Sequence, residues 1–428
     1  MQADGLVGSN STWGAEGIVS GIYDKLSLSA GYTHFETDGW RENADQNDDF
    51  ANIFAQYELS YKTSIQAEYR YRDTERGDIQ LRFFEDDIIP DLFQDDETKT
   101  GRLGFRHAFS PNSVFIGNFS YQDVISDSSF KVFIDPSILG FPPPDIEDFQ
   151  DIDVDEEAYT GEIQHLFRSQ YVNTVAGAGY FDVKQDFQLN ESITWPGISP
   201  PLLLSDDTEF VDSDINHFNL YLYSYINLMK NVTLTVGASG DFFKRDEKEN
   251  GGRDLDEDQF NPKFGITWKP FPNTTLRGAV FHTLKRLLTT DQTLEPTQVA
   301  GFNQFYDDPN ATKAWVYGGA VDQRFSQKIY GGVALSYRDL EVPFFEFAPQ
   351  PATGFTLSET EWREYLGRAY LFWTPHKWFG LSAEYLYEKL ERDREFTDGI
   401  VEVKTHHFPL GVLFPSLRIE RWLKRDVY

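Results

Sequence analysis

The connections between the predicted strands of this chain fall into two length classes that alternate strictly. Tight polar turns recur near Asp24-Lys25, Tyr61-Lys62, Pro111-Asn112, Ser169-Gln170, Lys230-Asn231, Pro270 to Asn273, Gln327-Lys328, Pro375-His376 and Pro415-Ser416. One long, acidic connection lies between each neighbouring pair of turns, over residues 38–49, 73–98, 124–157, 185–214, 244–258, 285–312, 339–358 and 391–399. This alternation is typical of a large antiparallel β-barrel that crosses a membrane, with short turns at one rim and long loops at the other.

The predicted strands alternate apolar and polar residues with a period of two. Segments 232–239 and 381–388 show this pattern, and segment 63–73 shows it most clearly. An apolar face of about nine residues is long enough to cross a bilayer when the strand is tilted. In segment 63–73 the apolar row contains Ile65, Ala67, Tyr69 and Tyr71. The polar row contains the candidate lumen-lining residues Gln66, Glu68, Arg70 and Arg72. The alternative for this row is a salt-bridged polar interior with no role in transport.

The composition supports strands and excludes several other classes of protein. Aromatic residues make up 16% of the chain, whereas it has 2 Met and no Cys, so disulfides and thiolate metal sites are excluded. A net charge of −31 argues against nucleic acid as a partner. No apolar stretch approaches 18 residues, which excludes transmembrane helices. The mean hydropathy of −0.48 still suits barrel strands, because only one face of each strand meets lipid.

Aromatic residues lie beside nearly every tight turn. Rings at these positions are typical of a girdle at the membrane–water boundary. A soluble β-sandwich or propeller is the alternative, although its connections would not separate into two length classes. The residues concerned are Tyr23, Tyr61, Phe109, Tyr171, Phe271, Phe325, Tyr330, Trp373, Trp378 and Phe414.

The two ends of the chain differ from the pattern between them. Residues 12–23 lead into a tight turn, so an ascending strand should precede them, and residues 1–11 would be its remnant. Residues 417–428 are basic and alternate poorly, unlike the rest of the chain. We therefore expect a single barrel domain over residues 1–428, with about 18 to 19 strands, cut short at both ends.

Four runs of residues form a recognisable set: 258–268 (DQFNPKFGITW), 273–277 (NTTLR), 284–286 (LKR) and 293–298 (TLEPTQ). They resemble the barrel region of TonB-dependent receptor-like proteins. In that family a strand pair of the form Asn-Pro-Lys-hydrophobic-Gly-hydrophobic is followed by a loop and then by a Leu-x-Pro element that opens the next strand. The resemblance covers most of residues 14–414 and implies an outer-membrane barrel of about 22 strands.

The same resemblance bears on the partners of the chain. Receptors of that family carry an N-terminal plug, a TonB-contacting segment and a last strand that ends in an aromatic residue. None of these segments is matched by residues 1–428. Some relatives carry helical repeats in place of the plug, so TonB and periplasmic domains outside this chain are both candidate partners.

Two features of the sequence are candidate metal-binding sites. Asp151, Asp153 and Asp155 are alternate carboxylates that could chelate Ca²⁺, although Glu156 stands where an EF-hand loop needs glycine. The alternative is a solvated loop that shares divalent ions with lipopolysaccharide. The adjacent His406 and His407 should point to opposite faces of a strand and could not easily bind one metal. No cofactor is predicted.

The leading hypothesis is a transport barrel of the bacterial outer membrane, in contact with its lipid and lipopolysaccharide. Connections 124–157, 185–214 and 285–312 would bind or admit an unidentified solute. A barrel module of an export or assembly machine is the second hypothesis. A rim-site hydrolase is the third, although no clustered catalytic constellation is visible and we do not expect an enzyme.

Overall fold

The computed structural model describes residues 1–80, 88–247, 254–286, 292–347, 355–394 and 400–413. Nearly all secondary structure within these ranges is β-strand. None of the helices described there is long and apolar enough to span a bilayer. The short 3-10 helix η2 (Pro136–Leu139) is capped by Asp135, whose carboxylate accepts a hydrogen bond from the Ser137 amide.

The strands are long, and most of them are joined by the tight turns that the sequence indicates. The first half of the chain forms β1 (Gln2–Val7), β2 (Trp13–Tyr23), β3 (Leu26–Thr37), β4 (Gln46–Ser60), β5 (Thr63–Arg76), β6 (Phe93–Ser110), β7 (Ser113–Ile134), β8 (Ile146–Arg168), β9 (Val172–Trp195) and β10 (Leu202–Met229). The second half forms β11 (Val232–Glu247), β12 (Leu255–Phe271), β13 (Thr274–Leu284), β14 (Gln298–Val299), β15 (Phe302–Asn303), β16 (Lys313–Arg324), β17 (Ile329–Phe347), β18 (Phe355–His376), β19 (Phe379–Arg392), β20 (Glu402–His407) and β21 (Leu410–Leu413).

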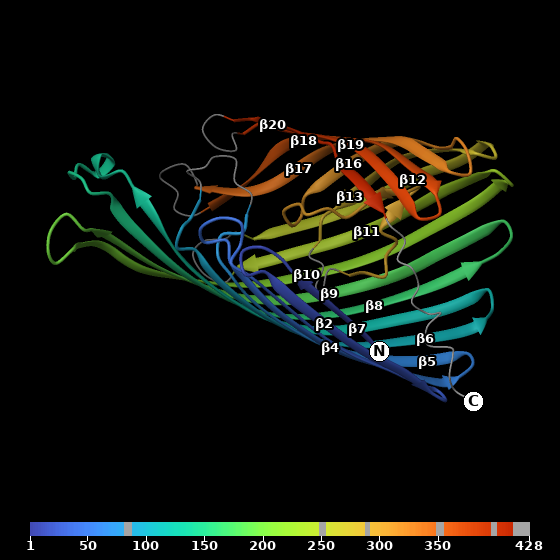
Figure 1. Cartoon of the computed structure of the whole chain (residues 1–428), viewed down its shortest axis with the longest axis horizontal. Coiled ribbons are helices and arrows are strands. Elements are labelled where there is room, and N and C mark those ends of the chain that lie inside the picture. Colours follow the sequence, from blue (N-terminus) through green and yellow to red (C-terminus); the bar gives the residue numbers. More distant parts are fainter. Residues whose placement is uncertain (81–87, 248–253, 287–291, 348–354, 395–399, 414–428) are drawn as a thin grey trace.

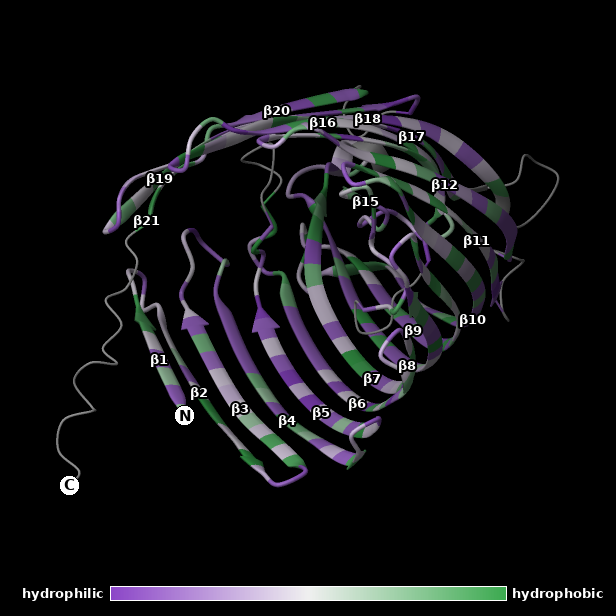
Figure 2. Cartoon of the chain, turned by 90° about the vertical axis from the view of Figure 1, so that its right-hand side faces the viewer, coloured by the Kyte–Doolittle hydropathy of each residue, from purple (hydrophilic) through white to green (hydrophobic). Residues whose placement is uncertain are grey.

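Each long strand pairs in antiparallel fashion with the strands before and after it, in one 19-stranded sheet. Strand β13 pairs with β16, and β19 pairs with both β20 and β21. The small hairpin β14–β15 stands apart from this sheet. Figure 2 shows the sheet curved around a central space. Within the described ranges, no strand pairing joins β1 to β20 or β21.

The two faces of the sheet have opposite chemistry. On β10 the apolar side chains of Phe218, Leu220 and Leu222 are exposed, whereas the alternate residues His217 and Asn219 are buried on the other face. Exposed apolar rows of this kind suit hydrocarbon, where a charged side chain at the bilayer midplane would cost about 2–4 kcal/mol. The sequence prediction of an apolar face and a polar face on each strand is therefore confirmed in the fold.

Most of the predicted tight turns and the aromatic residues beside them are found where the sequence places them. Tyr23, Tyr61, Phe109 and Tyr171 are all exposed at this rim of the sheet. The turn predicted at Pro375-His376 is shifted, because His376 still pairs with Phe379. The turn itself is Lys377-Trp378. Phe414, the turn at 415–416 and residues 417–428 lie outside the described residues.

Several connections predicted as long loops are in fact strand extensions. Residues 124–157 continue β7 to Ile134 and resume as β8 at Ile146. Residues 185–214 are likewise mostly strand, and so are the described residues of 244–258. The prediction was wrong because the period-two pattern continues through these residues. Carboxylates occupy the row of positions that is apolar nearer the tight turns, as in 151–155 (DIDVD). Figure 1 shows the extensions of β7 to β10 projecting beyond the rest of the sheet.

Candidate functional site inside the barrel

The connection between β13 and β16 turns toward the interior of the sheet. The Lys285 amide donates to the Thr312 carbonyl at 2.7 Å, and the Ala311 amide donates to the Lys285 carbonyl at 2.8 Å, so the two ends of the connection are held together. Leu284 and Ala311 pack in one buried apolar cluster with Val183 and Ile215 on the inner face of the strands. The prediction that 285–312 is a connection is confirmed, but its described residues fold inward.

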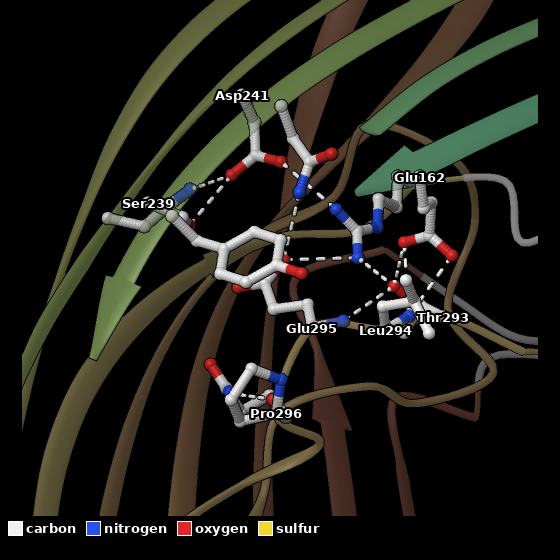
Figure 3. A network of polar contacts seen from close by, with 12 residues as sticks. Glu162, Ser239, Asp241, Thr293, Leu294, Glu295 and Pro296 are labelled. Atoms are coloured by element: carbon white, nitrogen blue, oxygen red, sulfur yellow. Dashed lines mark hydrogen bonds and ion pairs between the residues drawn. The ribbon is translucent and has the colours of Figure 1, made fainter. Parts of the chain in front are cut away.

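Glu295, in the middle of this connection, is bound by three side chains at once. The Tyr223 hydroxyl donates to its Oε1 at 2.6 Å, and the Asn219 amide donates to its Oε2 at 3.0 Å. The Arg286 guanidinium pairs with the same Oε2 at 3.0 Å. All four side chains are buried (Figure 3). A carboxylate removed from water in this way is stable only because its oxygens are paired.

Glu162, on β8, fixes the next residues of the same connection. Its carboxylate accepts hydrogen bonds from the Thr293 hydroxyl at 2.6 Å and from the Leu294 amide at 3.0 and 3.1 Å. The Gln164 side chain donates to the Leu294 carbonyl. Strand β8 thus binds both the amide and the carbonyl of Leu294. Figure 3 shows Glu162 beside Thr293 and Leu294.

Asp241, on β11, completes the network from the opposite side. It accepts hydrogen bonds from Ser239 at 3.0 Å and from Asn261 at 2.7 Å, and His217 Nε2 lies 3.1 Å from it. Arg286 Nη1 lies 3.8 Å from the same carboxylate. Three buried carboxylates therefore surround Arg286, and their negative charge is what holds this cation in the interior.

Two aromatic rings and a second cation enclose the network. The guanidinium carbon of Arg286 lies 5.4 Å from the ring centre of Phe181 and 5.1 Å from that of Phe305. The buried ammonium of Lys263 donates to the His282 carbonyl at 3.1 Å. Arg286 is thus bound both electrostatically and through the faces of two rings.

A cavity of about 500 Å³ lies beside this network on the inner face of the sheet. Its walls include Gln66 and Arg102 from the sheet, and Glu162, Thr293 and Leu294 from the network. The sheet and the inward connection therefore enclose a polar space between them.

The predicted lumen-lining row lies close to this cavity. Glu68 pairs with Arg70 at 2.8 Å and with Arg102 at 3.0 Å, and Gln66 lines the cavity itself. Arg72 lies farther along the strand and pairs with Asp48 at 2.7 Å. The row is salt-bridged, and its role along a solute path stays a prediction.

Asp151, Asp153 and Asp155 lie on β8 and not in a loop, contrary to the prediction. Their alternation places them on one face of the strand, where Asp153 stands opposite Asp127 of β7. In the portion of the chain that the structure describes, no group of three or more His, Asp or Glu side chains is arranged to hold a metal ion.

Sequence reasoning missed Arg286, Asp241 and the other residues of the buried network. Two of the runs that carry the family resemblance, 284–286 and 293–298, contain Arg286 and Glu295. The Leu-x-Pro element does precede a strand, the two-residue β14 at Gln298, but the next strand of the barrel sheet, β16, begins only at Lys313. The burial of Glu295 within this element was not predicted.

The exposed apolar band, the two unequal rims and the polar interior define a β-barrel of the bacterial outer membrane. A family model described as "TonB dependent receptor-like, beta-barrel" matches residues 35–322. The chain belongs to this family. The family is one of receptor-like barrels and not of enzymes.

Solved structures share the fold at low sequence identity. The ferripyoverdine receptor of Pseudomonas aeruginosa has 12% identity and a TM-score of 0.68, with 95% of this chain and 58% of that chain covered. The ferric-catecholate import receptor Fiu of E. coli K12 has 11% identity and a TM-score of 0.67, with 97% and 68% covered. The ferric citrate transporter FecA has 13% identity and a TM-score of 0.66, with 96% and 62% covered. The chain thus spans about three fifths of the length of such receptors. No curated protein matches the sequence.

Proposed function

We propose that this chain forms the barrel of an outer-membrane receptor that takes up a solute through its interior. The short turns would face the periplasm, and the strand extensions would face the medium. The observation that supports this most strongly is the inward connection 292–312, which is held by buried charges beside a cavity of about 500 Å³. A purely structural barrel would gain nothing from burying three carboxylates around one arginine.

The solved relatives suggest which solutes to test first. Solved structures of this fold include the ferripyoverdine receptor, the ferric-catecholate import receptor, the ferric citrate transporter and the copper transporter OprC. We propose uptake of a solute of comparable size, energised through TonB, with the polar row Gln66, Glu68 and Arg70 beside its path. Outer-membrane lipid and lipopolysaccharide would surround the apolar face.

Uptake by intact cells tests this proposal. Cells with and without the gene would receive labelled ferric complexes, copper or short peptides, with and without a protonophore. We expect one class to enter several-fold faster when the gene is present, and this gain to vanish with the protonophore. Equal uptake of every class by both strains would contradict the proposal, and a gain that survives the protonophore would contradict the TonB step alone.

A further inference from the structure

Four strands continue far beyond their neighbours at the long-connection rim. Among the residues that the structure describes, β6 pairs with β7 only as far as Ser129, and β11 pairs with β10 only as far as Ser213. Beyond these points β7 to β10 form a sheet of their own, visible at the far left of Figure 1. We call this part, together with the four residues of β7 at its base that still pair with β6, the distal sheet: residues 126–134, 146–154, 187–195 and 202–211.

The face of the distal sheet that continues the barrel interior has an apolar centre. Val154 stands opposite Phe187, which stands opposite Val211. In the adjacent row of the same face, Ile152 stands opposite Leu189. Closer to the barrel, the same face carries Val183 and Ile215, which Leu284 and Ala311 of the inward connection cover. The chain itself thus covers the end of this apolar face that is nearer the barrel. A ligand would cover the part that lies on the distal sheet.

Carboxylates border this apolar centre on the same face. Glu209 stands opposite Leu189, and the next row pairs Glu191 with Asp207. Burial, together with the nearby charges of Asp148 and Asp207, raises the pKa of the Glu191 carboxyl. None of the residues paired in these rows is basic. The face therefore presents apolar side chains within a negatively charged border, and a cation would relieve the repulsion.

The opposite face is acidic as well. Asp186 stands between Asp155 and Asp212 in adjacent strands, and Asp127 stands opposite Asp153. With a net charge of −31, the chain would attract cationic molecules to this rim and repel anionic ones.

The size of the surface limits what can occupy it. Four strands at spacings of about 4.8 Å span about 14 Å, and four rows of alternate residues span about 20 Å. The resulting area of about 280 Å² is far below the ~800 Å² per partner of a stable protein interface. An extended peptide of seven residues is about 23 Å long and matches it.

We propose that the inner face of the distal sheet binds a short cationic peptide in extended form, with its apolar side chains on Val154, Phe187 and Leu189 and its cations on Glu191 and Asp207. This inference rests on the proposed uptake, because it specifies a short cationic peptide as the class of solute taken up. The peptide would lie on a face that leads directly into the barrel.

A binding assay tests the proposal without requiring transport. The protein in detergent micelles is titrated against a labelled heptapeptide, Lys-Ser-Val-Ser-Val-Ser-Lys (the Lys-Val peptide), whose Lys and Val residues share one side of the extended chain, and fluorescence anisotropy is measured. A Glu-Val heptapeptide and a Lys-Ser heptapeptide serve as probes that lack the charge or the apolar side chains. We expect the Lys-Val peptide to bind at least about tenfold more tightly than either.

Paired variants locate the site. Leu189→Ser and Glu191→Gln should each weaken binding by about tenfold, whereas Gln188→Ser and Asp186→Asn, on the opposite face of the same strand, should leave it within about twofold. Equal weakening by Asp186→Asn and Glu191→Gln would overturn the proposal, because binding would then be diffuse attraction to an acidic surface. Failure of the Lys-Val peptide to bind more tightly than the Glu-Val peptide would also overturn it. Binding without uptake by cells would contradict the proposed transport and leave this site intact.

Discussion

Arg286 is held by contacts that a surface arginine does not have. Its guanidinium pairs with Glu295 at 3.0 Å and lies 3.8 Å from Asp241, within a buried network. Removing one partner of a buried ion pair leaves the other charge uncompensated. The resulting loss of stability exceeds the net stability that the intact pair contributes. The charges of single residues therefore decide whether the connection stays inside the barrel.

Replacing Arg286 with alanine should release the inward connection. The change leaves Glu295 and Asp241 without their shared cation, and the free energy of opening should fall by about 3–5 kcal/mol. Hydrogen exchange of residues 292–312 measures this opening. Arg363→Ala is the matched control, because Arg363 pairs with Glu361 at an exposed position and its loss should cost about 0–1 kcal/mol. Equal effects of the two variants would contradict the account.

The hairpin β14–β15 depends on a glycine in the strand beneath it. A Cβ at Gly318 would come within 2.4 Å of the Phe302 ring, whereas a Cβ at Gly319 would meet nothing within 4 Å. Phe302 is buried in a cluster with Tyr223, Phe281 and Val316. The small residue at 318 therefore allows the inward connection to pack against β16.

Gly318→Ala should displace Phe302 and loosen the hairpin by about 1–3 kcal/mol, the usual cost of overpacking. The adjacent Gly319→Ala provides the control and should have little effect. Limited proteolysis within residues 292–312 reports the difference between the two variants. Identical cleavage rates in both would show that Phe302 does not hold the connection.

The strand extensions should respond to pH. Asp127 lies 14 residues beyond the start of β7, farther than the roughly 9–11 residues that cross the bilayer. Burial and neighbouring carboxylates raise the pKa of Asp95, Asp127 and Asp153. The folded state therefore binds protons at a higher pH than the unfolded state does, and stability rises as pH falls through the raised pKa values.

Hydrogen exchange of residues 123–129 and 149–155, corrected for the intrinsic effect of pH, measures this response. Protection should increase as the pH is lowered from neutrality toward the ordinary pKa of aspartate, about 3.9. The Asp127→Asn variant should be more protected at neutral pH and should respond less. Protection that decreases over this range would mean that the carboxylates do not repel one another in the fold.

The sequence predicts the strands of this chain much better than it predicts the interior. Turns such as Asp24-Lys25 and Lys230-Asn231 are local signals and lie where they were predicted. The extensions of β7 and β8 were missed because carboxylates replace the apolar row there. The bond between Thr293 and Glu162 joins residues 131 positions apart, and no local pattern indicates such a contact.

At the scale of the whole molecule, one rule organises the sheet: alternate residues face lipid and the interior. Ile65 and Gln66 are neighbours on β5 and belong to the apolar row and the polar row respectively. Ile65 is exposed on the outer face, and Gln66 lines the inner cavity. The family assignment, the polar network and the proposed uptake all depend on this separation of the two faces.

Because the chain has no Cys, single cysteines at positions 65 and 66 can be labelled uniquely with a fluorophore. The protein is reconstituted into bilayers, and quenching by brominated lipid is compared with quenching by aqueous iodide. The account predicts that lipid quenches the label of Ile65→Cys, whereas iodide quenches that of Gln66→Cys. Equal quenching of both labels by iodide, with none by lipid, would show that this face does not lie in a membrane and would contradict the account.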